Sequence, residues 1–261
     1  LPTGCVATLR GRAADAYDAD GNPRLRVLLR ADIDGLPVTE DTGLPYASCT
    51  PGRMHACGHD IHTATMLGAI AVLQQLADQL RGEVRIVFQP AEENGSGAVR
   101  MVGTGVTDGV DAAFATHVWS DVPFGKVSIE PGPRMANADW WDAEIFGTGS
   151  HGAIPHKGND AILAAAAIVQ NLQSIVSRRV NPFEPAVVTV GTINGGTARN
   201  VIADHVTLSG TFRTYSDQTR DIVLEQIENI FTSTAATFGC TATFKLIDDR
   251  SRVVINDEKI T

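Results

Sequence analysis

The sequence is poor in cysteine and aromatic residues, and it has no excess of positive charge. Lysine and arginine total 21 of 261 residues against 30 aspartates and glutamates, so the net charge is -9. A general nucleic-acid binder needs a basic face that displaces counterions from phosphates. The charge balance therefore disfavours this class, and we expect no nucleic-acid partner.

Long hydrophobic runs are also lacking. The longest apolar run covers residues 161–169, far short of the roughly 20 residues that cross a bilayer. The chain does not open with a basic segment followed by an apolar one, as a secretory signal would. We predict a soluble, cytoplasmic protein that has no membrane partner.

The four cysteines are too sparse and unpatterned for a disulfide framework. Cys5, Cys49 and Cys240 are expected to be reduced and to pack as small hydrophobic groups. Cys57 is expected to be the exception because histidines surround it in the sequence. The hydrophobic content of 43% is that of a folded protein, and the length fits one large domain or two small ones.

The first half of the chain alternates predicted strands and helices. Strands are expected at residues 26–30, 84–88 and 112–115, with helices at residues 61–80 and about 98–103. Gly82 is expected to close the first helix as a left-handed cap. Strands that are separated by helices favour a parallel or mixed α/β sheet.

The pattern changes after about Pro131. Strands are expected at residues 141–147, 186–193, 206–212 and 241–247, with helices at residues 161–176 and 217–238. Ser216 is a good N-cap for the second of these helices, and Gly239 is expected to end it. The order strand-helix-strand-strand-helix-strand is that of a small ferredoxin-like unit. The proline- and glycine-rich residues 130–133 are expected to join the two domains.

Potential metal ligands are densest in residues 52–62, which hold three of the seven histidines together with Cys57. Cys57 and His59 are two residues apart, so in an extended segment both face the same way. A cysteine thiolate and a neutral histidine both bind transition metals. Taken alone, the segment could equally be a capped helix start with incidental histidines.

Three of the predicted strands end in residues that also suit metal binding or proton transfer. Asp32 follows the first strand, the adjacent Glu92 and Glu93 follow the second, and His117 follows the third. In open α/β sheets, sites gather at the carboxyl ends of strands. One glutamate could bind a metal while the other moves a proton, and Asp32 could orient a histidine. Each feature alone could be a turn or a solvated loop, but together they predict a metal-dependent hydrolase.

These segments resemble the amidohydrolase branch of the dinuclear metallopeptidase family, which includes hippurate hydrolase, aminoacylases and plant indole-acetyl-amino-acid hydrolases. The resemblance rests on residues 29–37, 54–62, 88–93 and 117–119, in that order. It implies a mixed-sheet, zinc-peptidase-like catalytic domain over residues 1–131, resumed at residues 249–261. A ferredoxin-like lid that dimerises the protein would be inserted over residues 132–248.

Complete members of this branch are longer than the chain at both ends. They begin with a further helical segment and a strand, and they end with a second catalytic half that carries one more metal-ligating histidine. The resemblance therefore implies that the chain is truncated and that its metal site lacks one ligand.

The resemblance also assigns roles within the catalytic domain. Two divalent metal ions (Zn, Mn or Co) would be bridged by the thiolate of Cys57, with His59, Glu93 and His117 as terminal ligands. Glu92 would be the general base toward the attacking water, and Asp32 would sit behind the cluster.

In the lid, the resemblance implies that His151 reaches the active site of the partner subunit. Asn200 and Arg213 would contact the substrate carboxylate or the oxyanion. Turn, cap and surface roles are the alternatives for these three residues.

The implied activity is hydrolysis of a small-molecule N-acyl amino acid, of the hippurate type, to a carboxylate and a free amino acid by a homodimer. One alternative is an exopeptidase of the same fold that acts on dipeptides. Another is an inactive, truncated module that dimerises through its lid and binds metal weakly.

Overall fold

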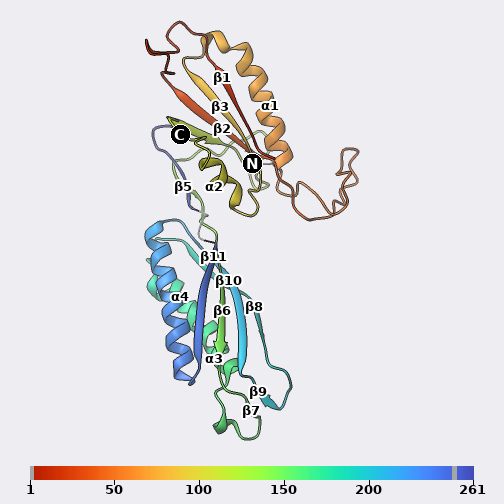
Figure 1. Ribbon diagram of the computed structural model, residues 1–261, viewed down its shortest axis with the longest axis vertical. Coiled ribbons are helices and arrows are strands. Elements are labelled where there is room, and N and C mark those ends of the chain that lie inside the picture. The colour runs from red at the N-terminus through yellow and green to blue at the C-terminus, as the bar shows by residue number, and fades with distance from the viewer. Residues whose placement is uncertain (1–2, 249–251) are drawn as a thin grey trace. The chain divides into compact units, whose positions relative to one another are not determined.

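The computed structural model describes residues 3–248 and 252–261, and the chain divides into two compact units (Figure 1). The first unit covers Leu1–Ser128 and the second covers Ile129–Thr261. Both units combine helices with sheets, so the predicted α/β class is confirmed. The assignment of residues 249–261 to a catalytic domain stays a prediction, and residues 249–251 lie outside the described residues.

A mixed four-stranded sheet forms the centre of the first unit. Its order is β1-β3-β2-β4, with β2 parallel to both β3 and β4 and with β1 antiparallel to β3. The strands are β1 (Cys5–Arg10), β2 (Arg26–Asp32), β3 (Glu83–Gln89) and β4 (Ala112–Ala115). The predicted mixed sheet is confirmed. Strand β1 is an addition that the sequence does not reveal, because this edge strand is largely exposed and lacks an alternating apolar pattern.

Helices α1 (His59–Gln75) and α2 (Ser96–Val102) pack against this sheet. Met66 of α1 lies in one cluster with Ala31 and Ile86, whereas Met101 of α2 packs with Leu28 and Val87. Neighbouring positions along a strand face opposite ways, so Ile86 and Val87 lie on opposite faces of the sheet. The sheet is therefore covered by one helix on each face.

The first helix ends earlier than predicted. Helix α1 stops at Gln75, and the chain tightens into the short 3-10 helix η1 (Ala77–Gln79). Ala77 is buried there, and its carbonyl accepts a hydrogen bond from the amide of Arg12. Gly82 is not a left-handed helix cap, since its φ is 143°. It is needed because a Cβ atom would lie 2.0 Å from the carbonyl oxygen of Leu25.

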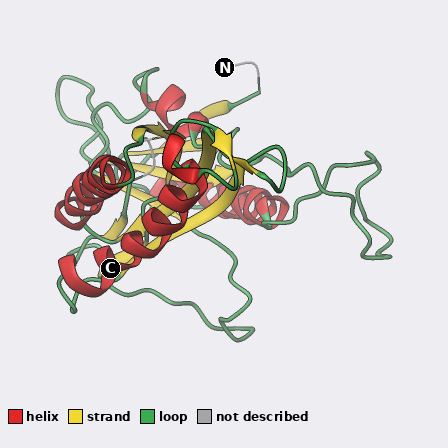
Figure 2. Cartoon of the chain, turned by 90° about the horizontal axis from the view of Figure 1, so that it is seen from below, coloured by secondary structure: helices red, strands yellow, loops and turns green. Residues whose placement is uncertain are grey.

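The parallel strands place three loops at one edge of the sheet. Because β2, β3 and β4 run in the same direction, their carboxyl ends meet at this edge. A long loop, residues 33–58, leads from β2 to the start of α1 and is one of the extended loops drawn green in Figure 2. The start of α1 therefore joins the same edge.

The second unit contains an antiparallel sheet of order β11-β6-β10-β8. Its elements follow the chain as β6 (Asp139–Phe146), α3 (Ala161–Ser174), β8 (Ala186–Gly195), β10 (His205–Thr214), α4 (Asp217–Thr237) and β11 (Thr241–Asp248). This is the strand-helix order predicted for a ferredoxin-like unit. Two short pairs complete the unit: β7 (Ser150–His151) with β9 (Val201–Ile202), and β5 (Gly132–Met135) with β12 (Val254–Asn256).

The larger hydrophobic core belongs to the second unit. Trp141 and Phe212 from the sheet are fully buried against Ile168 and Leu172 of α3 and Phe231 of α4. Helix α3 continues into the π-helical turn η3 (Ile175–Arg179), and residues 161–179 are long and apolar enough to cross a membrane by length and composition alone. One face of α3 is buried in this hydrophobic core, as is typical of a core helix in a folded domain.

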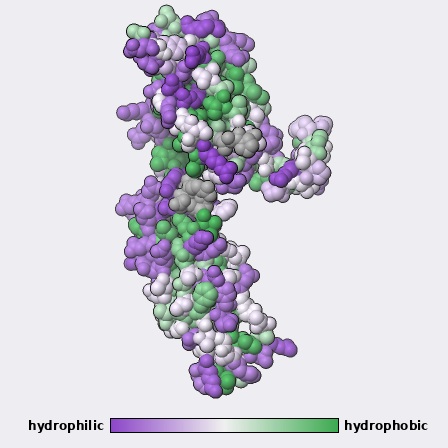
Figure 3. Space-filling model, in the orientation of Figure 1, coloured by the Kyte–Doolittle hydropathy of each residue, from purple (hydrophilic) through white to green (hydrophobic). Residues whose placement is uncertain are grey.

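The first unit has smaller apolar clusters and a surface with hydrophobic as well as hydrophilic areas (Figure 3). Its exposed apolar side chains include Leu67 and Val72 on α1, Phe114 on β4, and Trp119. Polar contacts lie at both ends of its sheet, such as the ion pair of Arg26 with Glu83 at the amino end and the contacts of Asp32 at the carboxyl end.

Candidate metal centre

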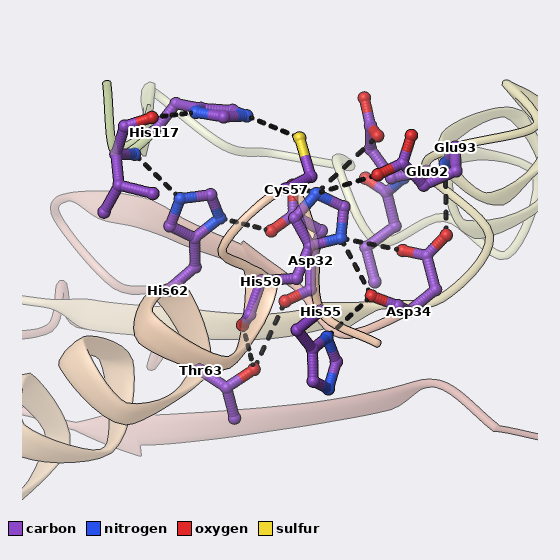
Figure 4. A network of polar contacts seen from close by, with 12 residues as sticks. Asp32, Asp34, His55, Cys57, His59, His62, Thr63, Glu92, Glu93 and His117 are labelled. Carbon is purple, nitrogen blue, oxygen red and sulfur yellow. Dashed lines mark hydrogen bonds and ion pairs between the residues drawn. The ribbon is translucent and has the colours of Figure 1, made fainter. Parts of the chain in front are cut away.

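Six sequence-predicted residues of the first unit come together at the carboxyl edge of the sheet (Figure 4). Ligand atoms of Cys57, His59 and His117 lie within 4.8 Å of one another, and so do those of His59, Glu92 and Glu93. Asp32 lies beside both groups, with a carboxylate oxygen 3.6 Å from Nε2 of His59. His59 belongs to both groups and occupies the middle of the cluster.

His59 is the first residue of α1 and is completely buried. Its Nδ1 lies 3.1 Å from the carbonyl oxygen and 3.2 Å from the carboxylate of Asp34. Both partners are acceptors, so Nδ1 carries the proton and Nε2 presents a lone pair. That lone pair points toward carboxylate oxygens of Glu93 and Glu92, at 3.7 and 3.9 Å.

Two buried atoms at this point lack partners. Among the described residues, neither Nε2 of His59 nor Oε1 of Glu93 has a hydrogen-bond partner. A buried polar atom without a partner costs about 1–3 kcal/mol, and a charged one costs more. Two acceptors cannot satisfy one another, but a cation between them would satisfy both.

The loop after β3 presents the two glutamates through an unusual turn. Ala91 has a φ of 54°, in the left-handed region that side chains other than glycine rarely adopt. Its carbonyl accepts a hydrogen bond from the amide of Gly97 at 3.0 Å, which closes the turn. Burial, reinforced by the adjacent charge of Glu93, raises the pKa of Glu92. Glu92 is thus the carboxylate better suited to accept and release a proton.

Cys57 and His117 form the other side of the cluster. Sγ of Cys57 lies 3.5 Å from Nε2 of His117. Nδ1 of His117 donates to the carbonyl of Val118 at 2.6 Å, which leaves Nε2 free to act as a ligand. Burial, and then the charges of Glu93 and Glu92, raise the pKa of the Cys57 thiol. A thiolate at this position therefore requires a nearby cation.

Asp32 lies behind the cluster with both carboxylate oxygens engaged. Oδ1 accepts from Nδ1 of His62 at 2.6 Å, and Oδ2 accepts from Arg30 at 2.8 Å. Burial alone would raise the pKa of Asp32, but the His62 hydrogen bond and the Arg30 charge outweigh it and lower that pKa. Asp32, His59 and His62 also lie within 4.8 Å of one another. We regard these three as a hydrogen-bonded group, because Nε2 of His62 is also occupied, by the amide of Val118 at 2.9 Å.

Sequence reasoning missed two contributors to this geometry, Asp34 and His62. Asp34 fixes the tautomer of His59, and its Oδ2 accepts from the amide of Glu93 at 3.1 Å. The histidine that Asp32 contacts at hydrogen-bonding distance is His62 rather than His59. The sequence does contain a signal for His62, because His59 and His62 are three residues apart and residues at this spacing share one face of a helix.

The candidate residues of the second unit occupy two places within that unit. His151 lies on β7, and the amide of the next residue donates to the carbonyl of Asn200, so His151 and Asn200 are neighbours. Both are exposed. Arg213 lies near the far end of β10, eight residues beyond His205 and thus about 26 Å along the strand. The structure therefore does not bring Arg213 together with the other two.

The residues of the first unit fit a divalent metal ion. Imidazole, thiolate and carboxylate are the groups that bind zinc and related first-row transition metals. A cation would pair the orphaned atoms of His59 and Glu93 and offset the like charges of the adjacent glutamates.

The comparison with known proteins agrees with this chemistry. The family model described as Peptidase family M20/M25/M40 matches residues 28–261. N-acetyl-L-cysteine deacetylase of Bacillus subtilis is 46% identical over 235 residues, which are 90% of the chain and 56% of that protein. N-acyl-L-amino acid amidohydrolase of Geobacillus stearothermophilus is 46% identical over 231 residues, 88% of the chain and 62% of that protein.

A solved structure is also similar. The YXEP protein of Bacillus subtilis, described as a dinuclear metal binding peptidase from the M20 family, has a TM-score of 0.81 and 37% identity. The match covers 98% of the chain and 63% of that structure. The chain thus spans roughly three fifths of the length of these similar proteins.

The turn at Gly58 provides a test of how tightly the His117 loop packs on the site. Gly58 has a φ of 85°, and a Cβ atom there would lie 2.4 Å from Cγ2 of Val118. Gly52 has a similar φ of 70° but nothing within 4 Å. Either substitution to alanine should lower the free energy of unfolding of the first unit by about 1–2 kcal/mol through backbone strain. We expect Gly58→Ala to lower this free energy of unfolding by a further amount of about 1–3 kcal/mol, because the added methyl group overpacks against Val118.

The loss is measured by urea-dependent hydrogen exchange of the α1 amides. Adding Val118→Ala to Gly58→Ala should remove most of the extra loss, since Cγ2 is the colliding atom. Equal losses for Gly52→Ala and Gly58→Ala would show that the two loops do not pack as described.

Proposed function

The chain belongs to the Peptidase family M20/M25/M40, and we propose that the protein is a metal-dependent amidohydrolase that cleaves N-acyl amino acids to a carboxylate and a free amino acid. The observation that carries the proposal is the orphaned pair formed by His59 Nε2 and Glu93 Oε1, with Glu92 beside it. The names of the similar proteins support the substrate class.

We propose that Cys57, His59, Glu93 and His117 are the residues that would hold two divalent ions (Zn, Mn or Co), with Cys57 supplying a thiolate. The description of the similar structure as a dinuclear metal binding peptidase supports the number of two, and the free nitrogen of His59 can serve only one of the ions. When bound, such ions polarise an amide carbonyl and bring the pKa of water to roughly 7. Asp32 stays behind the ligands, because both of its oxygens are already occupied.

Glu92 acts as the general base in this proposal. It takes a proton from the attacking water as the carbon–oxygen bond forms. It then delivers that proton to the amide nitrogen as the carbon–nitrogen bond breaks, which releases the amine. A carboxylate with a raised pKa suits both steps, because it holds the proton between them.

His151 is proposed to donate to the oxyanion. Its Nδ1 accepts a hydrogen bond from the amide of Ala153 at 3.1 Å, so in the neutral ring Nε2 carries the proton and serves as a donor. Arg213 is proposed to bind the carboxylate of the substrate, and Asn200 to assist in binding the carboxylate or the oxyanion.

The separation of these residues favours a homodimer. Arg213 lies at one end of β10, whereas His151 and Asn200 lie beyond the other end. One copy of the unit cannot bring all three to a single substrate of amino-acid size. In a two-fold dimer, each site can take Arg213 from one subunit and His151 with Asn200 from the other. Residues 132–248 are then the lid that joins the subunits.

An exopeptidase that acts on dipeptides is the second candidate, favoured by the peptidase description of the similar structure. The third is a module that binds metal without catalysis.

We place the protein in the cytoplasm. None of its four cysteines, all among the described residues, forms a disulfide, and free thiols suit a reducing compartment.

Glu92→Gln separates these functions. Protein loaded with Zn²⁺, Mn²⁺ or Co²⁺ is offered N-acetyl and N-benzoyl amino acids and, in parallel, dipeptides. We expect hydrolysis of the acyl substrates, and we expect Glu92→Gln to lower kcat by at least about 10²–10⁴-fold, as loss of a general base does. Metal content, measured by elemental analysis, should stay unchanged because Glu92 is not a proposed ligand.

Other outcomes point elsewhere. Hydrolysis of dipeptides alone would favour the exopeptidase, and metal binding without any hydrolysis would favour the non-catalytic module. If Glu92→Gln protein loses its metal together with its activity, Glu92 is a ligand and the role of base is wrong.

Mixed dimers test the shared site. His151→Ala should lower kcat far more than it raises KM, since the proposed hydrogen bond forms mainly in the transition state. Mixing His151→Ala subunits with Glu92→Gln subunits should restore part of the activity, because one of the two sites then has both residues intact. Mixed dimers that are shown to form and yet stay as inactive as both parents would contradict the shared site.

A further inference from the structure

His62 is a buried residue that takes no part in the proposed ligand set, yet both of its ring nitrogens are hydrogen-bonded. It lies on α1 and is 3% exposed. Nε2 is 2.9 Å from the amide nitrogen of Val118, and Nδ1 is 2.6 Å from Oδ1 of Asp32. An amide can only donate, so Nε2 is the acceptor and Nδ1 carries the proton. His62 is thus a neutral ring held in one tautomer between two fixed partners.

The contact at Val118 leads directly to His117. The carbonyl of Val118 accepts from Nδ1 of His117 at 2.6 Å, which turns Nε2 of His117 toward Sγ of Cys57 at 3.5 Å. The rings of His62 and His117 also meet edge to face, with centroids 4.7 Å apart. The backbone of Val118 therefore links His62 to the ligand atom of His117.

The other end of this link is rigid. Asp32 is the last residue of β2, paired with Gln89 in the neighbouring strand β3. Arg30 bridges the two, since it donates to Asp32 at 2.8 Å and to Gln89 at 2.9 Å. His117, by contrast, lies in an exposed loop two residues beyond the end of β4. A fixed carboxylate at one end and a loop at the other mean that His62 positions the loop.

We propose that His62 is a positioning residue that holds the His117 loop in its metal-binding arrangement by accepting from the amide of Val118, while Asp32 fixes the tautomer in which Nε2 is the acceptor. It is not a ligand, because neither ring nitrogen is free. This role rests on the proposed metal centre, and it predicts that metal affinity depends on the contact with Val118 in particular. Figure 4 shows the ring of His62 between Asp32 and the segment that carries His117.

Two substitutions separate the ends of the link. In His62→Asn, the shorter amide can still donate to Asp32 from near the Nδ1 position, but nothing reaches the amide of Val118. In His62→Gln, the longer side chain can place its oxygen near the Nε2 position and accept from Val118. Met66→Leu is the matched control, because Met66 is buried one turn further along α1 and packs with Ala31 and Ile86 in an apolar cluster.

The measurement is the Co²⁺ affinity by competition with a chelator, with the thiolate-to-cobalt absorption band of Cys57 as the spectroscopic readout. We expect His62→Asn to lower the affinity about 10–100-fold, the usual effect of removing a residue that orients a ligand. The thiolate-to-cobalt absorption band of Cys57 should change together with the affinity. His62→Gln and Met66→Leu should keep the affinity within the same order of magnitude. Circular dichroism confirms that each variant is folded.

The proposal is overturned if His62→Asn binds Co²⁺ as tightly as the parent, or if His62→Gln or Met66→Leu falls as far as His62→Asn. A second readout needs neither metal nor substrate. Nitrogen-15 NMR of the metal-free protein should show the proton of His62 on Nδ1, and a proton on Nε2 would contradict the link. A protein that passes both tests but hydrolyses no amide would refute the proposed function and leave the role of His62 intact.

Discussion

The arrangement of the first unit depends on one electrostatic constraint, which is the unpaired nitrogen of His59 buried among carboxylates. Asp32, Glu92 and Glu93 each place an oxygen within 4 Å of this nitrogen. Packing carboxylates around an acceptor is unfavourable unless a positive charge joins them. Arg30 forms an ion pair with Asp32, and its charge also acts on Glu92, but the pKa of Glu92 is still raised. A cation therefore stabilises this edge of the sheet, and the side chains are arranged to receive one.

The fold meets this constraint by separating the proposed ligands from the groups that orient them. Asp34 accepts hydrogen bonds from His59 and from the amide of Glu93, while Asp32 accepts from His62, which in turn accepts from the amide of Val118 beside His117. Each orienting carboxylate is on or just beyond β2, a strand paired on both sides. The proposed ligands on loops are thereby connected by hydrogen bonds to a strand at the centre of the sheet, which is how proteins commonly keep a metal site ordered.

Much of this arrangement could be predicted from local sequence patterns. Apolar runs mark β2, β3 and β4, and parallel strands must end at the same edge, so the convergence of Asp32, Glu93 and His117 follows from topology alone. Which carboxylate orients which histidine could not be predicted, because that depends on where α1 begins relative to β2. The separation of Arg213 from His151 also required the sheet register of the second unit. The early end of α1 follows from the tertiary burial of Ala77, which helix propensity does not encode.

The most direct test of the central claim is a crystal structure of the protein grown with Zn²⁺ or Mn²⁺, with anomalous diffraction measured at the absorption edge of the metal. The account predicts anomalous peaks about 2.0–2.3 Å from Nε2 of His59, Oε1 of Glu93, Sγ of Cys57 and Nε2 of His117, with His62 still hydrogen-bonded to Asp32 and Val118. Crystals that bind the metal elsewhere and leave Nε2 of His59 and Oε1 of Glu93 without a cation would contradict it.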